Sequence, residues 1–284
     1  MNLKDLWKNL KENLFSVETM NLFQSVSEEI HKAQAVPVEE LKRVWAEIEP
    51  HLKLLGKRLA ELEQKAEYSK KIHALNTVLS SHGWFIPPSC NEELIDRLVT
   101  MIEKNADSRV IIQAIVFHYR DRENVRPIFI KAYEHSVFTK RQSLLEEAFE
   151  AHLQGKYGLA IPILLAQSEG AFKEALAAES LFRREVWQPE VVEEAVKELP
   201  ITEIVLADIL RGFSEAMYNE FTTSVYTVAD FEQLKKDLGY SPLSRHAVLH
   251  GIDSSYGTEE NSLKALFLLD TVRAMIEICT KSVS

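Results

Sequence analysis

Residues 241–261 read SPLSRHAVLHGIDSSYGTEEN, a short polar stretch enclosed by apolar sequence with helical spacing. Its first two residues are a signal for a helix start, because a serine hydroxyl can cap a helix and proline is tolerated in the first turn. Gly251 stands where a left-handed residue commonly ends a helix. The stretch therefore predicts one helix, with Arg245 in its middle and His250 at its C-terminus.

We refer to residues 241–261 as the cassette. After the predicted helix it continues as a polar loop that contains Tyr256, which we take as a candidate substrate-binding residue. Thr258 can cap the next helix, and two glutamates follow in its first turn, where the helix dipole favours negative charge. The cassette thus combines an arginine, an imidazole and a tyrosine between two helix ends.

Arg245 and His250 carry the chemistry of the cassette. Arginine presents five donors in a planar fork that suits phosphate, and the negative end of a helix dipole favours a protonated histidine. A guanidinium that neutralises phosphate and an imidazole that moves protons are the minimum for metal-free RNA cleavage by the ribose 2′-OH. Because five residues turn a helix by about 140°, the two side chains would flank a cleft that a second helix or subunit completes. The spacing also allows a plain basic helix end that binds carbonyl groups and water.

The sequence Arg245-His246-Ala247-Val248-Leu249-His250 resembles the R-polar-x3-H motif of the HEPN superfamily, whose all-α domains often act as metal-independent ribonucleases. The string SRHAVLHG…YGTEENSLKALFLLD looks like the last two helices of such domains, and RQSLLEEAFEAHLQGKYGLAIPILLAQSEG looks like the opening ones. This resemblance covers the chain from about residue 135 to the end. It implies a bundle of four or five helices that dimerises with two motifs face to face. The superfamily also contains non-catalytic RNA-binding and scaffold members.

Glu169 is the acidic residue with the clearest candidate role. It follows the apolar start of a helix expected over Tyr157–Glu179, which should be central in its bundle. A buried carboxylate needs a positive partner or stays protonated. Arg245 is the candidate partner, and in the families that this chain resembles an acidic residue on that helix can orient the arginine. The alternative is that Glu169 begins a solvated helix end together with Lys173 and Glu174.

Composition and charge limit the range of functions. The chain has 284 residues with 33 Lys+Arg and 43 Asp+Glu, which gives a net charge of −10. Proteins that coat long nucleic acid are usually basic, so the charge argues against bulk nucleic-acid binding but allows a small local site. We find no signal-peptide pattern and no run long enough to span a bilayer, and we expect a cytoplasmic protein that does not bind membranes. No phosphate-binding-loop, dinucleotide, nucleophile-elbow or zinc-ligand pattern occurs, so we expect no cofactor and no metal.

Apolar positions recur at helical spacing almost throughout the chain, which predicts an all-α fold. We divide it into an N-terminal helical accessory or recognition region, residues 1–134, and a HEPN-like helical bundle, residues 135–284. In the second part, helices are expected over Thr139–Gln154, Ile201–Arg211, Gly212–Tyr226, Val228–Leu238 and Thr258–Ile278.

The N-terminal region carries no catalytic motif. Residues 41–66 follow a heptad pattern, for which a helix packed on its own bundle and an inter-chain coiled coil are both open. Pro50 predicts a kink or break within it, because proline removes a helix hydrogen bond. Trp84 and Phe85 lie in a turn, where an aromatic pair is expected to plug the core rather than stack on bases.

These observations combine into one functional hypothesis, a metal-independent endoribonuclease. Arg245 would bind and neutralise the phosphate, and His250 would act as general acid or base. His246 would hold the polar position beside them, and Glu169 would orient Arg245. Neighbouring helix residues point about 100° apart, and on this ground we expect His246 and His250 not to flank one phosphate. A second copy of the chain would then supply the second proton-transfer group.

Lys264, in the last helix, is the remaining candidate for substrate binding, although its position favours a solvent-facing side chain. The resemblance implies an RNA substrate, a homodimer, and a setting in phage defence, toxin action or stress response, with an antitoxin as a conceivable partner. The competing hypothesis is a catalytically silent helical module that binds RNA, a nucleotide or a protein. Local charge distinguishes the two, and residues 241–284 contain four basic and five acidic side chains.

Overall fold

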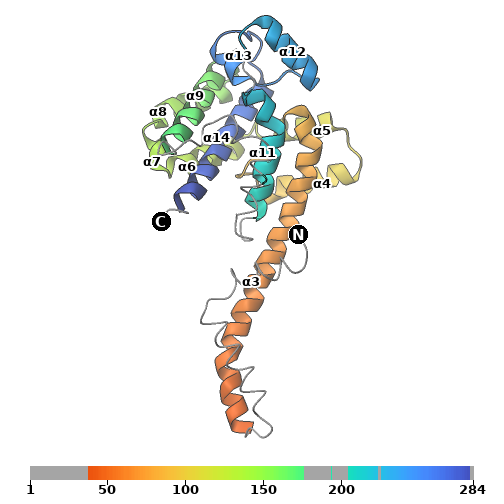
Figure 1. Cartoon of the computed structure of the whole chain (residues 1–284), viewed down its shortest axis with the longest axis vertical. Coiled ribbons are helices and arrows are strands. Elements are labelled where there is room, and N and C mark those ends of the chain that lie inside the picture. The colour runs from red at the N-terminus through yellow and green to blue at the C-terminus, as the bar shows by residue number, and fades with distance from the viewer. Residues whose placement is uncertain (1–37, 176–192, 194–203, 223–224, 282–284) are drawn as a thin grey trace. The chain divides into compact units, whose positions relative to one another are not determined.

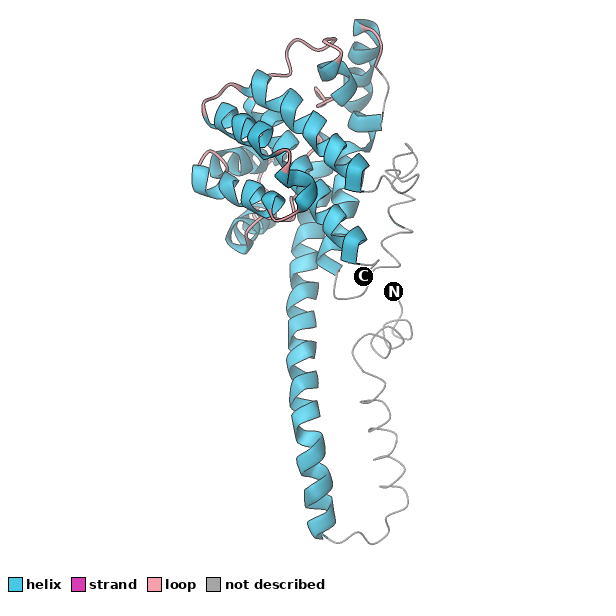
Figure 2. Ribbon diagram, turned by 90° about the vertical axis from the view of Figure 1, so that its left-hand side faces the viewer, coloured by secondary structure: helices cyan, strands magenta, loops and turns pink. Residues whose placement is uncertain are grey.

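The structure is a computed structural model that describes residues 38–175, 193, 204–222 and 225–281. Every regular element in these ranges is helical (Figures 1 and 2), so the predicted all-α fold is confirmed. In chain order the helices are α3 (Val38–Leu79), η1 (Ser80–His82), α4 (Glu92–Glu103), α5 (Ser108–His118), α6 (Arg122–Tyr133), α7 (Ser136–Thr139), α8 (Gln142–Leu153), α9 (Tyr157–Ala175), α11 (Ile204–Thr222), α12 (Val228–Leu238), α13 (Arg245–Leu249) and α14 (Glu259–Lys281). Helical spacing also predicts two helices over Asn2–Leu14 and Val17–Ala33, and the sequence predicts a loop with one short helix over Trp187–Pro200. These segments lie outside the described residues, except for Glu193.

The chain divides into two compact units. Residues up to Lys70 and Glu198–Val205 belong to one, and Lys71–Lys197 and Leu206–Ser284 belong to the other. The second unit contains the whole cassette. It also runs across the boundary that we placed between residues 134 and 135, because α6 packs against both α8 and α14. A separate recognition role for residues 1–134 stays a prediction.

Helix α3 is continuous across Pro50, so the break that we considered there does not occur. A proline removes one hydrogen bond from a helix and leaves the remaining ladder intact, and in this long helix the remaining ladder is sufficient. Most of the side chains of the heptad positions in residues 41–66 lie outside the described set, and the coiled coil stays a prediction.

Helix α14 is the centre of the second unit. It lies beside α9 (Figure 1) and also packs against α5 and α6. Residues 261–274 are buried without interruption, although they include charged side chains. A helix buried on all sides is a core helix, so the burial of α14 is not limited to one apolar face.

The aromatic pair Trp84 and Phe85 plugs this core, as the sequence predicted. Each side chain is only 1% exposed. Both rings meet Phe267 of α14 edge to face, with centroids 6.1 Å apart. Such pairs stabilise a core beyond the area that they bury, and neither ring is available to stack on a base.

Helix α11 is one helix, where the sequence suggested two segments that meet at Gly212. The glycine serves close packing: a Cβ there would lie 2.0 Å from Nδ2 of Asn76. Asn76 donates to the carbonyl of Asp208 (3.0 Å) and accepts from the backbone N–H of Ile86 (3.1 Å). One amide thus joins α3, α11 and the turn after η1.

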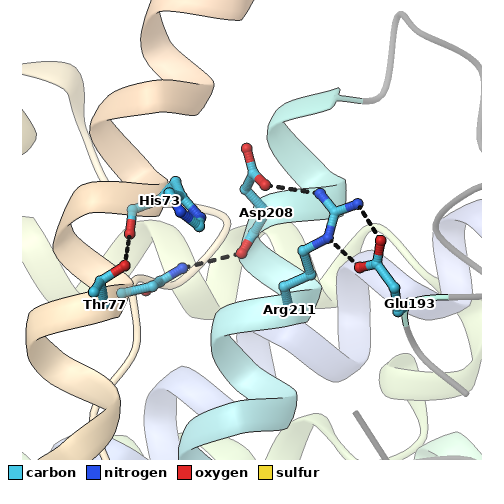
Figure 3. A network of polar contacts seen from close by, with 6 residues as sticks. His73, Thr77, Glu193, Asp208 and Arg211 are labelled. Atoms are coloured by element: carbon cyan, nitrogen blue, oxygen red, sulfur yellow. Dashed lines mark hydrogen bonds and ion pairs between the residues drawn. The ribbon is translucent and has the colours of Figure 1, made fainter. Parts of the chain in front are cut away.

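A charged network extends from the same part of α11 (Figure 3). The guanidinium of Arg211 donates to Oδ1 of Asp208 (2.9 Å) and through Nε to Oε2 of Glu193 (2.6 Å). These contacts raise the pKa of Arg211, with the Glu193 hydrogen bond as the main cause. The network links α11 to Glu193, which precedes it in the chain.

Candidate functional site

The cassette helix is shorter than the sequence suggested. α13 spans Arg245–Leu249, and its N-cap is Ser244, whose hydroxyl accepts from the backbone N–H of Ala247 (3.2 Å). The predicted start at Ser241 is wrong, because a serine closer to the helix satisfies the free N–H groups. Arg245 is therefore the first helical residue rather than a mid-helix one. The predicted end is confirmed, since Gly251 has a positive φ of 71°.

Arg245 and Glu169 are brought together across 76 residues of sequence. Nη1 of Arg245 lies 2.6 Å from Oε2 of Glu169, and the two side chains are 31% and 19% exposed. The other carboxylate oxygen of Glu169 contacts Nζ of Lys173, one turn further along α9. The carboxylate thus holds the guanidinium and also makes the solvated-end contact that the sequence offered as its alternative.

His246 and His250 contact each other, contrary to our expectation. Their ring centroids are 4.3 Å apart with the planes at 44°. Residues four apart lie on the same face of a helix, so the expectation that the two rings point apart is wrong. One chain therefore presents two adjacent imidazoles on the helix that Arg245 begins.

The orientation of His246 follows from its hydrogen bond. Its Nδ1 contacts the carbonyl oxygen of Val225, and a carbonyl can only accept, so Nδ1 carries the proton. In the neutral ring Nε2 is then the acceptor nitrogen. The ring of Tyr226 meets His246 edge to face, with centroids 5.0 Å apart.

Tyr226 contacts His246 in the candidate site, and the sequence did not predict this role. Its side chain is 72% exposed, and two further exposed apolar side chains, Val228 and Leu249, belong to the same segments. The sequence placed Tyr226 at the end of a helix, and no motif marks it. The signal that could have found it is the pair Val225–Tyr226 directly before the Thr227 cap.

Tyr256 is engaged in holding the cassette loop. Its hydroxyl donates to the carbonyl of Gly158 at the start of α9 (3.0 Å), and its own carbonyl accepts from Nδ2 of Asn261 (3.0 Å). A Cβ at Gly257 would stand 3.4 Å from Gly158, so the backbones approach closely here. These contacts give Tyr256 a positioning role for the loop.

Lys264 is buried, with 3% of its surface exposed, so the solvent-facing placement is wrong. Its Nζ donates to the carbonyl of His82 (3.2 Å) and lies over the rings of Trp84 (5.6 Å) and Tyr240 (5.2 Å). Aromatic faces attract a cation, which makes the burial of an ammonium group tolerable. Periodicity alone could not reveal this because α14 is buried on every side.

The loop after α13 is fastened by a buried aspartate. Oδ1 of Asp253 accepts from the backbone N–H and the hydroxyl of Ser255 (2.7 and 2.8 Å), and its own N–H donates to the carbonyl of Ala247. Asp253 is 4% exposed. The end of α13 and the following loop therefore form one connected unit that fixes the position of His250.

No group of three or more His, Cys, Asp or Glu side chains in the described part of the chain is arranged to hold a metal ion. No helix within the described ranges is both long and apolar enough to cross a membrane.

A scan against protein-family models, a search of curated proteins and a search of solved structures each found no match. Function is therefore inferred from the geometry around α13.

Proposed function

We propose that the chain cleaves RNA without a metal ion at a site made by Arg245, His246, His250 and Glu169. The observation that supports this is that one short helix carries both a guanidinium held by a carboxylate and two imidazoles in contact. This combination supplies phosphate neutralisation and two proton-transfer groups.

In the proposed reaction, the ribose 2′-oxygen attacks phosphorus while the bond from phosphorus to the 5′-oxygen breaks. Nε2 of His246 accepts the proton of the 2′-OH, because its Nδ1 is committed to the Val225 carbonyl. His250, which is exposed, donates a proton to the leaving 5′-oxygen. Arg245 stabilises the negative charge that develops on the phosphoryl oxygens. The products are a 2′,3′-cyclic phosphate and a 5′-hydroxyl.

The surroundings suit a local RNA contact rather than a long binding surface. Glu169 contacts two cations, Arg245 and Lys173, so this group of three side chains keeps one positive charge. The exposed ring of Tyr226 beside His246 offers a surface on which a base can stack. A single-stranded substrate of a few nucleotides fits this arrangement better than a duplex does.

Incubation of the purified protein with total RNA in EDTA tests the proposal. The wild type should cleave and leave 2′,3′-cyclic ends, and His250→Ala or His246→Ala should each slow cleavage about 10²–10⁴-fold. His73→Ala is the matched control, since His73 is an exposed histidine on α3 outside the site. Equal cleavage by wild type and His250→Ala would falsify the catalytic assignment.

A second candidate function is a catalytically silent module that binds RNA, a nucleotide or a protein. The observation in its favour is the charge balance, because residues 241–284 hold four basic and five acidic side chains. A setting in phage defence, toxin action or stress response, and an antitoxin partner, rest on the HEPN resemblance. Binding of RNA by the wild type with no cleavage in EDTA or in magnesium would favour this alternative.

A further inference from the structure

A cavity of about 750 Å³ lies in the second unit, between α5, the first turn of α14 and the two ends of the cassette. None of Arg245, His246, His250 and Glu169 lines it, so it is distinct from the proposed catalytic site. Its volume falls within the range of about 300–1,000 Å³ that is typical of small-molecule sites. The side chains around it show what class of molecule it suits.

The charges that line the cavity have a positive excess. Three are cationic (Arg109, Arg120 and Lys264) and two are carboxylates (Glu259 and Glu260), which leaves one net positive charge. Arg120 and Glu259 form a two-bond pair at 2.7 and 2.8 Å and so neutralise each other. Because the chain has a net charge of −10, the positive charge of this cavity comes from its own lining residues and not from an overall excess of basic side chains.

Arg109 is the cation best placed to meet a ligand. Its backbone is fixed in the first turn of α5, where its N–H donates to Oδ1 of Asp107 (2.8 Å). Its Nη1 lies 3.9 Å from Oε2 of Glu260, which is too far for a hydrogen bond, and its side chain is 56% exposed. The guanidinium fork can therefore engage a phosphate or carboxylate group through two parallel hydrogen bonds.

Lys264 adds a second positive charge from the buried wall. Its ammonium group is held by the carbonyl of His82 and by the ring of Tyr240. Charges act more strongly at a wall with low dielectric than in open water. His82, whose Nε2 contacts the hydroxyl of Ser108 (2.7 Å), has a pKa lowered by burial and by Arg109, so it is a neutral hydrogen-bonding group at pH 7.

Two aromatic side chains give the cavity an apolar side. Phe117 is 69% exposed, and Tyr240 lines the wall next to Lys264. An exposed phenylalanine beside a group of cations suits a ligand that has both a charged end and a flat or apolar part. An anion without such a part would leave this surface in water.

We propose that this cavity binds a small organic phosphate, with the phosphate held by Arg109 and Lys264 and the apolar part of the ligand packed on Phe117 and Tyr240. Phosphate fits better than a single carboxylate, because it carries more charge and offers three oxygens to cations on two walls. The site does not depend on the proposed RNA cleavage.

Titration calorimetry with adenosine 5′-monophosphate tests the proposal. The wild type should bind it, Arg109→Gln should bind at least tenfold more weakly, and Phe117→Ala should weaken this ligand but not inorganic phosphate. Adenosine, which lacks the phosphate, should bind at least tenfold more weakly than the monophosphate. Arg126→Gln is the matched control, because Arg126 is exposed on α6 and does not line the cavity.

The outcomes separate this proposal from the catalytic one. His250→Ala should bind the monophosphate as the wild type does, even if it has lost all RNA cleavage. A short deoxyoligonucleotide with a 5′-phosphate distinguishes two sources of the same chemistry: tighter binding than the monophosphate identifies a strand end, and weaker binding identifies a free small molecule. No binding by the wild type, or equal binding by wild type and Arg109→Gln, would overturn the site.

Discussion

Glu169 shows at the scale of a single residue why the sequence left two interpretations open. One predicted an ion pair with Arg245, and the other predicted a solvated end beside Lys173. The structure contains both contacts, one on each carboxylate oxygen. A carboxylate has two oxygens, so a pattern that predicts one partner does not exclude another, and only the fold shows which cations are within reach.

The pair Glu169–Arg245 should be energetically coupled. Because the side chains are 19% and 31% exposed, we expect a coupling of about 1 kcal/mol, between surface pairs and fully buried ones. A double-mutant cycle with Glu169→Gln and Arg245→Ala, followed by urea unfolding, measures it. Lys173→Ala is the control for loss of the other cation. If the two changes add without coupling, the carboxylate does not hold the guanidinium in solution.

His152 should make the protein sensitive to acid. It is 6% exposed, its Nδ1 lies 2.8 Å from the hydroxyl of Ser262, and burial lowers its pKa to about 4. The unfolded chain binds the proton from about pH 6.5 downward, and the folded chain does so only near pH 4. The stabilisation is therefore complete above about pH 6.5 and is lost as the pH falls toward 4, by about 3 kcal/mol in all.

Urea unfolding of the wild type and of His152→Gln between pH 7.5 and 4.5 checks this prediction. The variant should lose the part of the pH dependence that belongs to His152, whereas His73→Gln, a change at an exposed histidine, should keep it. An identical slope in wild type and His152→Gln would assign the acid sensitivity to other groups.

At the scale of elements, α11 contains a glycine, Gly212, whose packing role could not be predicted from the sequence. Gly212 looked like a joint between two helices, yet it lies within one helix and makes room for the amide of Asn76. Helix periodicity depends on neighbours along the chain. The reason for this glycine is a residue 136 positions earlier (212 − 76) that reaches it only in the folded state.

Gly212→Ala should destabilise the protein by about 1–3 kcal/mol. Helix propensity favours alanine by about 1 kcal/mol, but the new Cβ would stand 2.0 Å from Nδ2 of Asn76 and force that amide away from its partners. Gly158→Ala in α9 is the control, since a Cβ there meets nothing within 4 Å. Thermal unfolding compares the two, and a Gly212→Ala variant as stable as wild type would show that Asn76 moves freely.

The start of the cassette helix also depends on contacts that the local sequence does not show. Ser241 with its proline is the stronger local signal, but Ser244 caps the helix. Leu243 between them is fully buried, and Ser241 lines the cavity. Tertiary packing of these residues decides which serine is free to cap, and local sequence rules do not include it.

At the scale of the whole molecule, the helical pattern predicted most of the helices, but it did not predict which residues contact one another. The cap at Thr258 is predicted from local chemistry and is confirmed, because its hydroxyl accepts from the backbone N–H of Asn261 (3.2 Å). Lys264 was expected to face solvent, yet it is buried. Asp270 on the same helix is fully buried and accepts from Arg273 (3.1 Å) and from the N–H of Ser89 (2.6 Å). The sequence shows that Asp270 is charged, but it does not show that a hydrogen-bond partner lies 181 positions away in the chain.

The last prediction concerns a second copy of the chain, which the HEPN resemblance implies. Both imidazoles now come from one chain, so counting proton-transfer groups no longer requires a dimer. Arg245 begins α13 and His250 follows its end, and a rotation of about 140° separates them. In a two-fold dimer we expect the imidazole pair of one copy to face Arg245 of the other, so that the proposed site is completed between the two chains.

Mixing two inactive variants, Arg245→Ala and His250→Ala, tests this arrangement. With free exchange, half of the dimers contain one chain of each kind, and each such dimer has one site with both residues intact. Activity should then recover to about a quarter of the wild-type value. If Arg245 and His250 of the same chain work together, every site in the mixture lacks one of them and no activity returns. A monomer in light scattering at micromolar concentration, fully active on RNA, would also exclude the dimer.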